Sequence, residues 1–373
     1  TFYFEPDLCA GSFRNTPLFK ILLKKLCSED SIHVITTQPN RYHSYTIKTA
    51  SYEKGSNYEI TRITLPEHKS GMFDQGKSFI TFYRKFRKIT RKEEYDLIYA
   101  SSSRLFTAFL GRKIAKFADS LKDILANKKF IQKPLLFFIT QIERYTFSKA
   151  THINLVSEGF KTYFQKYSKP TYSYYTNGID DLFLQNKIKT TEQGNNDRVI
   201  ITYAGNIGSG QGLEKIIPQA AVYLGNKFQF KVIGDGGAKK SLIDEVTQLK
   251  ASNVEIIDPV SRDKLFDYYK STTFLFLHLN DFDAFKKVLP SKIFEYGATD
   301  KPIIAGVGGF AADFIKNNLT NYILFAPTNV DSFVSQIKSF KIEYQERVTF
   351  IEKYSRDNIV NSMSDNILSL IKN

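Results

Sequence analysis

Short apolar runs alternate with longer amphipathic segments along most of this 373-residue chain. The runs expected to form strands lie at residues 32–36, 60–65, 95–100, 152–157, 199–203, 228–233, 254–257, 274–279 and 302–305. Segments with helical spacing occur between them, at 17–26, 105–116, 158–167, 213–224 and 262–269 among others. Buried strands that alternate with helices are typical of parallel sheets. The pattern predicts an α/β fold with doubly wound sheets.

A polar stretch interrupts this alternation near the middle of the chain. Asn177-Gly178 is a strong turn signal, and residues 185–198 hold few apolar side chains. The length also suits two domains of roughly 150 residues each. We therefore expect residues 1–180 and 181–373 to form separate domains.

Two features indicate that the sequence lacks residues of the natural chain. It begins at Thr1, inside an expected strand, without a methionine or a signal sequence. The helical segment 105–116 also runs directly into Phe117, where the alternation requires a strand. We expect a gap between residues 116 and 117, and a natural deletion there is the alternative.

The positive charge is concentrated in the first half of the chain. Residues 1–180 hold 29 Lys and Arg against 16 Asp and Glu, whereas the remainder is almost neutral. Two cysteines are too few for a disulfide framework, which favours a reducing compartment. No apolar run reaches 18 residues, so the sequence predicts no membrane-spanning helix. His278 lies within an apolar run and is expected to be a hydrogen-bonded core residue.

Glycine-rich loops follow several predicted strands, and ligands of open α/β sheets bind at those strand ends. The longest loop runs from Gly205 to Gly212. The segment Leu289 to Tyr296 follows another strand and places Lys292 and Glu295 in the first turn of a helix. Backbone N–H groups and a lysine suit a phosphate, and a glutamate suits ribose hydroxyls. The alternative is an ordinary capped helix with a surface lysine and glutamate.

In their order along the chain, these motifs resemble glycosyltransferase family 4, the retaining nucleotide-sugar enzymes of the GT-B fold. Residues 177–183 are similar to the family's interdomain Asn-Gly-Val-Asp-x-x-Phe, and residues 203–212 to the first loop of its nucleotide-binding domain. Residues 233–236 match its Gly-x-Gly strand end, and 290–295 lie at its Glu-x7-Glu element. The resemblance implies two Rossmann-like domains facing across a cleft, with the last helix crossing back to the first domain.

The resemblance further implies a donor site in the second domain. The residues expected to bind the donor are Gly205, Asn206, Gln211, Gly234, Gly236, Val260, Pro290, Ser291, Lys292 and Glu295. Lys287 replaces the first glutamate of the family element, and neutral residues replace the Arg and Lys that the family commonly has at Asn206 and Gln211. The family makes metal dispensable, and we interpret Asp281 and Asp283 as solvated loop residues. No metal or other cofactor is expected.

The first domain is expected to bind the acceptor. The segment Glu5 to Arg14 resembles the family's glycine loop, with Gly11, Ser12 and Arg14 as acceptor-binding candidates and Arg14 reaching a phosphate. A surface loop before a helix is the alternative. Asp119, next to the expected gap, is the single catalytic candidate, and a solvated helix position is its alternative.

The Pro-Ser-Lys form of the donor motif is similar to a branch that acts in bacterial surface polysaccharide assembly and resembles N-acetylfucosaminyltransferases. This resemblance implies a UDP-linked N-acetylated, 6-deoxy hexose as donor. It also implies an undecaprenyl-diphosphate-linked saccharide as acceptor, in O-antigen or capsule synthesis.

The segment Phe79 to Lys92 interleaves aromatic residues with Arg and Lys, and Lys128 to Arg144 is a second basic, apolar segment. Basic helices with an apolar face suit an anionic membrane surface, so we expect peripheral association with the inner face of the cell membrane from the cytoplasm. For each segment, an amphipathic helix packed on the sheet is the alternative.

Two other functions are compatible with parts of the sequence. A nucleotide-sugar epimerase of a related fold shares the two-domain pattern, although the acceptor-type loop and the basic first half argue against it. The basic first half also suits a nucleic-acid-binding protein, but no recognised binding motif supports one. We expect no nucleic-acid partner.

Overall fold

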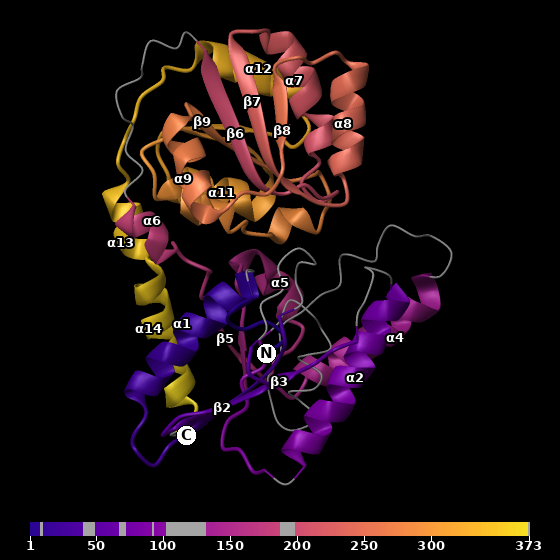
Figure 1. Ribbon diagram of the computed structural model, residues 1–373, viewed down its shortest axis with the longest axis vertical. Coiled ribbons are helices and arrows are strands. Elements are labelled where there is room, and N and C mark those ends of the chain that lie inside the picture. The colour runs from indigo at the N-terminus through magenta and orange to yellow at the C-terminus, as the bar shows by residue number, and fades with distance from the viewer. Residues whose placement is uncertain are drawn as a thin grey trace. The chain divides into compact units, whose positions relative to one another are not determined.

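The computed structural model describes residues 1–7, 10–39, 49–66, 72–91, 93–101, 132–186 and 198–371. The chain divides into two compact units (Figure 1). The first unit comprises residues 1–156, 161–177 and 357–373, and the second comprises 157–160 and 178–356. The expected boundary at Asp180 thus lies three residues beyond the one observed, and the last 17 residues group with the first unit.

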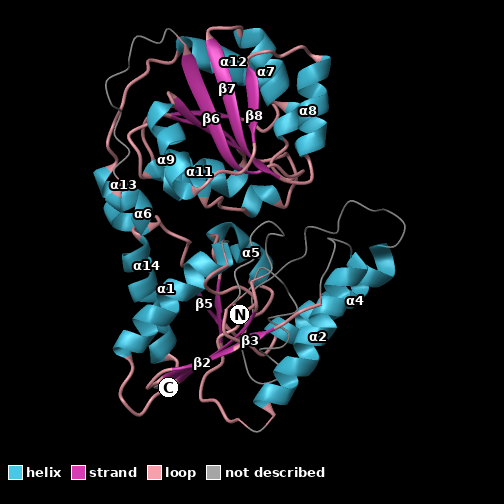
Figure 2. Ribbon diagram, in the orientation of Figure 1, coloured by secondary structure: helices cyan, strands magenta, loops and turns pink. Residues whose placement is uncertain are grey.

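The first unit contains two small sheets flanked by helices (Figure 2). Its strands are β1 (Ile32–Thr37), β2 (Tyr52–Lys54), β3 (Tyr58–Ile63), β4 (His152–Asn154) and β5 (Thr171–Ser173). The strand order is β1-β3-β2, in which β1 and β3 are parallel, and β4 pairs with β5 in parallel. Its helices are α1 (Ala10–Lys25), α2 (Met72–Thr90), α4 (Gln132–Phe147), α5 (Lys161–Phe164) and most of α14 (Arg356–Ser369).

Three predictions for the first half were wrong in detail. The strand expected at Thr1 is absent, because residues 1–4 form no strand. Residues 95–100 form no strand; instead Leu97 and Tyr99 pack their side chains against the cluster that joins α1 to α14. The helix expected at 158–167 is reduced to a 3₁₀ turn, η2 (Glu158–Phe160), and the four residues of α5. The Ser157 hydroxyl donates to the Lys287 carbonyl (2.5 Å), which ties the start of this segment to the second unit. At residues 95–100 and 158–167, tertiary contacts outweigh the local pattern.

The apolar face of α2 is buried within the first unit. Phe82 is almost fully buried. Its ring stacks on that of Phe86, with 5.9 Å between ring centres, and its ring centre lies 5.3 Å from that of Phe2. The exposed side chains of the helix are mainly basic: Lys77, Arg84, Lys85, Arg87 and Lys88, with Arg91 just after its end. The packed amphipathic helix, given above as the alternative, therefore describes α2, and its basic face is solvated.

The second unit is built on a six-stranded sheet. Its strands are β6 (Val199–Asn206), β7 (Phe228–Asp235), β8 (Val254–Ile257), β9 (Phe274–His278), β10 (Ile303–Gly306) and β11 (Tyr322–Phe325). Their order is β11-β10-β9-β6-β7-β8, and every neighbouring pair is parallel. This is the doubly wound order, which reverses between β6 and β9. The strand ends at that reversal are where a ligand is expected.

Helices cover both faces of this sheet (Figure 1). One face carries α7 (Ile217–Leu224), α8 (Lys239–Gln248) and α12 (Val330–Ser339). The other carries α6 (Asp181–Gln185), α9 (Arg262–Ser271), α10 (Lys292–Gly297), α11 (Gly309–Asn318) and α13 (Val348–Tyr354). Alternate strand residues serve the two faces: Phe274 and Phe276 of β9 join the first cluster, and Leu275 and Leu277 join the second. Burial on both faces explains why these strands are continuously apolar in sequence.

An ion cluster fixes the two chain segments that link the units. The Ile179 N–H donates to the Tyr354 carbonyl (2.8 Å), and the Arg356 N–H donates to the Ile179 carbonyl (3.1 Å). The buried Asp180 carboxylate accepts from Arg356 (2.9 Å) and Arg262 (3.0 Å) and caps α6. Burial opposes its charge, but the two guanidinium groups outweigh burial and lower the pKa of Asp180.

We expect Asp180→Asn to lower the free energy of unfolding by about 2–4 kcal/mol, because it keeps the cap but leaves two arginines without their carboxylate. Urea unfolding measures this difference. The control is Asp283→Asn, which removes an exposed carboxylate paired with exposed Lys286 and should change stability little. Equal effects of the two substitutions would contradict this role for the buried cluster.

Candidate donor-binding site

The expected donor residues of the second unit gather at the carboxyl ends of β6, β7 and β9. Gly205 and Gly234 face each other as register partners at the ends of β6 and β7. A Cβ at Gly234 would overlap the Gly205 carbonyl oxygen, so only glycine allows the strand ends to approach this closely. Gly236 lies in the next turn, against the Ile207 carbonyl. The ends of β6 and β7 thus form a glycine-lined surface beside the topological switch point between β6 and β9.

The loop from Gly205 to Gly212, hereafter the glycine loop, is closed by its own side chains. Asn206 Nδ2 donates to Gln211 Oε1 (3.0 Å), and the Gly208 N–H donates to the same oxygen (3.2 Å). The Tyr203 hydroxyl donates to the Asn206 carbonyl (2.6 Å). The two neutral residues that stand where the family has cations therefore bind each other and hold the loop in shape.

The end of β9 binds three successive carbonyls of the glycine loop. Asn280 donates through Nδ2 to Ser209 (3.0 Å) and through its N–H to Gly210 (2.8 Å). His278 donates through Nδ1 to Gln211 (2.5 Å). These contacts could not be predicted from the sequence, which shows only that polar residue types follow an apolar run.

His278 is a fully buried, hydrogen-bonded residue, which confirms the expectation for it. Its Nε2 accepts from the Thr328 N–H (3.0 Å), so the neutral Nδ1–H tautomer satisfies both partners. Burial lowers the pKa of His278 to about 4, with the Gln211 carbonyl opposing that shift and Lys215 adding to it. The ring is therefore neutral at physiological pH and carries no charge to the site.

Lys292 and Glu295 form an ion pair on the first turn of α10. Their side chains meet at 2.5 Å, and each is about a quarter exposed. A Cβ at Gly205 would lie 3.5 Å from Lys292 Cε, so the lysine lies beside the glycine loop. Burial opposes the lysine's charge, but Glu295 outweighs it and raises the pKa of Lys292. One accessible cation and one carboxylate thus adjoin the strand ends and can meet a phosphate and a pair of hydroxyls.

Tyrosines form the floor beneath this pair, and reasoning from the sequence missed them. Tyr269 and Tyr296 are fully buried and pack edge to face, with ring centres 5.8 Å apart. Burial raises the pKa of both hydroxyls well above the usual value, as it also does for Tyr203. The two phenols are therefore uncharged beside the ion pair.

The remaining donor candidates lie around this surface. Pro290 and Ser291 precede α10, although the Ser291 side chain makes no capping hydrogen bond. Val260 lies after β8, half-buried against the second cluster. Asp281 and Asp283 both pair with Lys286 at the protein surface.

The acceptor candidates lie in the first unit, and their expected loop conformation was wrong. The helix α1 begins at Ala10, so Gly11, Ser12 and Arg14 occupy its first turns. Contacts to the preceding segment stabilise this early start: Asn15 Nδ2 donates to the Tyr3 carbonyl (3.2 Å), and the Glu5 N–H donates to the Thr16 hydroxyl (3.2 Å).

Arg14 is buried, and its Nη2 lies 3.6 Å from Met363 Sδ on α14. Its Nε and Nη1 atoms have no hydrogen-bond partner among the described residues. Asp119, the catalytic candidate, lies outside the described residues, as do residues 105–116 and 128–131 of the segments discussed above.

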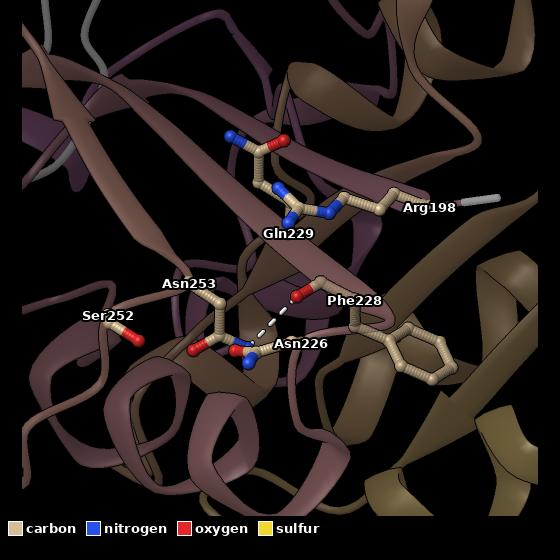
Figure 3. A pocket seen from close by; sticks show the side chains of 6 residues that line it. All are labelled: Arg198, Asn226, Phe228, Gln229, Ser252 and Asn253. Atoms are coloured by element: carbon tan, nitrogen blue, oxygen red, sulfur yellow. Dashed lines mark hydrogen bonds between the residues drawn. The ribbon is translucent and has the colours of Figure 1, made fainter. Parts of the chain in front are cut away.

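A pocket of about 250 Å³ lies at the opposite, amino-terminal ends of β6, β7 and β8 (Figure 3). It is lined by Arg198, Asn226, Phe228, Gln229, Ser252 and Asn253. Asn253 Nδ2 donates to the carbonyls of Ala221 (2.9 Å), Gly225 (3.0 Å) and Phe228 (2.9 Å). The Asn253 amide therefore stabilises the fold. The pocket lies at the amino ends of the parallel strands, whereas the donor candidates lie at their carboxyl ends, so the two are separate.

Known proteins resemble this chain in part of its sequence and in its fold. Residues 185–357 match the family model described as glycosyl transferases group 1. HepE from Anabaena, solved with UDP and glucose, is 14% identical, with a TM-score of 0.61 over 100% of this chain and 96% of that chain. A trehalose-6-phosphate structure from E. coli, bound with UDP-2-fluoro glucose, is 10% identical, with a TM-score of 0.69 over 100% and 98%.

WaaG, described as a glycosyltransferase involved in lipopolysaccharide biosynthesis, is 13% identical, with a TM-score of 0.61 over 100% of this chain and 96% of that chain. No curated protein matches the chain at the level of sequence. The chain has the α/β fold of GT-B proteins with two Rossmann-like domains, as expected. Residues 185–357 are thus similar to glycosyl transferases of group 1, and the chain as a whole shares its fold with solved glycosyltransferases. The epimerase and nucleic-acid alternatives are not favoured.

We expect acid to destabilise the fold through His278. Its pKa is about 4 in the folded chain against about 6.5 when unfolded, so the unfolded state gains the proton first as the pH falls. The resulting stability is complete above pH 6.5 and is lost toward pH 4, by about 3 kcal/mol.

Urea unfolding of the parent and of His278→Gln across this pH range measures the effect. The variant cannot titrate at this position, so its stability should fall less steeply than that of the parent. Parallel pH profiles for the two proteins would contradict the assignment.

Proposed function

We propose that the protein is a retaining enzyme of glycosyltransferase family 4 that transfers a sugar from a nucleoside diphosphate to a lipid-linked saccharide. The ion pair of Lys292 and Glu295 beside the glycine loop is the observation that carries the donor assignment. As the glycosidic bond breaks, the diphosphate gains negative charge, and a cation aimed at it stabilises the transition state. Glu295 accepts hydrogen bonds from the ribose hydroxyls.

We propose UDP as the nucleotide and an N-acetylated, 6-deoxy hexose, as in N-acetylfucosaminyltransferases, as the sugar. The structural neighbours HepE and the E. coli trehalose-6-phosphate protein were solved with UDP or a UDP-sugar, which supports the choice of base. The Pro-Ser-Lys form of the donor motif supports the choice of sugar. We further propose that no metal is needed, with Lys292 meeting the diphosphate charge. A binding screen of UDP, GDP, ADP and dTDP tests the base directly.

We propose an undecaprenyl-diphosphate-linked saccharide as the acceptor, in O-antigen or capsule synthesis, with Gly11, Ser12 and Arg14 binding it. The unpartnered guanidinium atoms of buried Arg14 suit an acceptor phosphate. The structural neighbour WaaG is described as involved in lipopolysaccharide biosynthesis, which supports an acceptor of this kind.

Among the described residues, no helix combines the length and the apolar character that crossing a membrane requires. We propose that the protein binds the inner face of the cell membrane peripherally, from the cytoplasm. The exposed basic face of α2 supports this proposal. Because the apolar face of α2 is buried in the fold, attraction to anionic lipids would act through charge alone.

We expect Lys292→Met to weaken UDP binding by about 1.5–3 kcal/mol, or roughly 10- to 150-fold, through loss of a charge-assisted hydrogen bond. Glu295→Gln should weaken binding as well, through the ribose. Isothermal titration of UDP measures both changes. The control is Lys316→Ala, an exposed lysine on α11.

A double variant that combines Lys292→Met with Glu295→Gln distinguishes direct contact with the donor from mutual stabilisation of the two residues. If each residue contacts the donor, the double variant binds no better than the weaker single variant. If the two residues only stabilise each other, the double variant recovers UDP binding, and the donor assignment is wrong.

We expect replacement of four exposed basic residues of the α2 face by serine to reduce sedimentation with vesicles of anionic lipids. The residues are Arg84, Arg87, Lys88 and Arg91; Lys85 is kept because it donates to the Thr64 carbonyl (3.0 Å). Each basic residue near such a surface contributes about 1 kcal/mol, and salt screens the attraction.

A matched variant carries four serines at exposed lysines of the second unit: Lys240, Lys264, Lys270 and Lys338. It has the same net charge as the α2 variant, so it shows whether membrane binding depends on where the basic residues lie or only on the total charge. Equal sedimentation of the two variants would refute a specific role for α2.

A further inference from the structure

The bonds from β9 determine how the peptide groups of the glycine loop are oriented. In a planar trans peptide the C=O and the N–H point in opposite directions. The Ser209 and Gln211 carbonyls are held toward β9, so the N–H groups of Gly210 and Gly212 point away from it. The Asn206–Gln211 contact closes the loop, and the bonds from β9 add the orientation of the peptide groups at 209–212.

Asn280 is itself held in one orientation. Lys215 Nζ donates to its Oδ1 (3.2 Å), which directs Nδ2 toward the Ser209 carbonyl (3.0 Å). Gly212 has a φ of +59°, and a Cβ there would lie 3.0 Å from Asn280 Cγ. The loop therefore packs directly on this amide, and the contact requires glycine.

We propose that His278 and Asn280 are positioning residues of the donor site, which orient the amides of the glycine loop toward the diphosphate of a bound nucleotide. This inference rests on the proposed function, because it assumes a nucleoside diphosphate at the switch point. Neither side chain needs to touch the ligand. Both side chains restrict the conformations of the glycine loop before the ligand binds. Removing either side chain therefore lowers the affinity for the diphosphate but not for the nucleoside.

Two substitutions of His278 test its two hydrogen bonds separately. His278→Asn places an amide near the position of Nδ1 and can still donate to the Gln211 carbonyl. His278→Gln places its polar end near Nε2 and keeps the Thr328 contact while losing the bond to the loop. Asn280→Ala removes the bond to Ser209.

The matched control is Asn253→Ala at the other end of the same sheet (Figure 3). Asn253 also donates its side-chain amide to backbone carbonyls, so its loss destabilises the fold without reaching the glycine loop. Thermal unfolding of every variant allows affinities to be compared at similar stability.

The experiment measures UDP and uridine binding to the parent and to each variant. We expect about tenfold weaker UDP binding for His278→Gln and Asn280→Ala, with uridine binding unchanged. His278→Asn should recover most of the UDP affinity, and Asn253→Ala should match the parent.

The inference alone is overturned if the parent binds UDP and His278→Gln binds it as tightly. It is also overturned if UDP and uridine weaken equally, or if His278→Asn is as impaired as His278→Gln. If the parent binds none of UDP, GDP, ADP and dTDP, the proposed function itself fails and this inference fails with it.

Discussion

The parallel pairing of β6 with β9 is the constraint on which the rest of the second unit depends. It reverses the strand order and thereby opens a site at the carboxyl ends of two adjacent strands. The glycine loop leaves β6 at this point, and it is bound by His278 at the end of β9 and by Asn280 just after that strand. The same chain then enters α10, which delivers Lys292 and Glu295 to the loop. One pairing thus brings together segments that are far apart in the sequence.

Much of this arrangement could be predicted from local sequence. The strands of the second unit are buried on both faces, so their apolar runs are unambiguous, and β8 was predicted to the residue. The strands β2, β5 and β11 were not predicted. β2 and β5 have only three residues each and no fully buried side chain, which leaves little apolar pattern. The expected strand at 95–100 was wrong because its apolar side chains pack between helices instead of in a sheet.

The residues of the candidate site were also predictable only in part. Lys292 and Glu295 could be placed together from their spacing on one helical turn, and the structure shows that they pair. The contacts of His278 and Asn280 could not be predicted, since a residue type shows which groups can donate but not which carbonyl will accept. The tyrosine floor was missed for a related reason. Tyr269 and Tyr296 look like ordinary core residues until α9 and α10 bring them together.

Under the proposed function, the ion pair between Lys292 and Glu295 also favours two-part ligands. Within the pair each charge already has a counterion, so a small anion that attracts the lysine must leave the carboxylate without one. Such an exchange gains little free energy. A nucleotide offers an anion to one residue and hydroxyl donors to the other, and so replaces both halves of the pair at once. Under that proposal, the internal pair acts as a competitor that free phosphate displaces poorly and a ribonucleoside diphosphate displaces well.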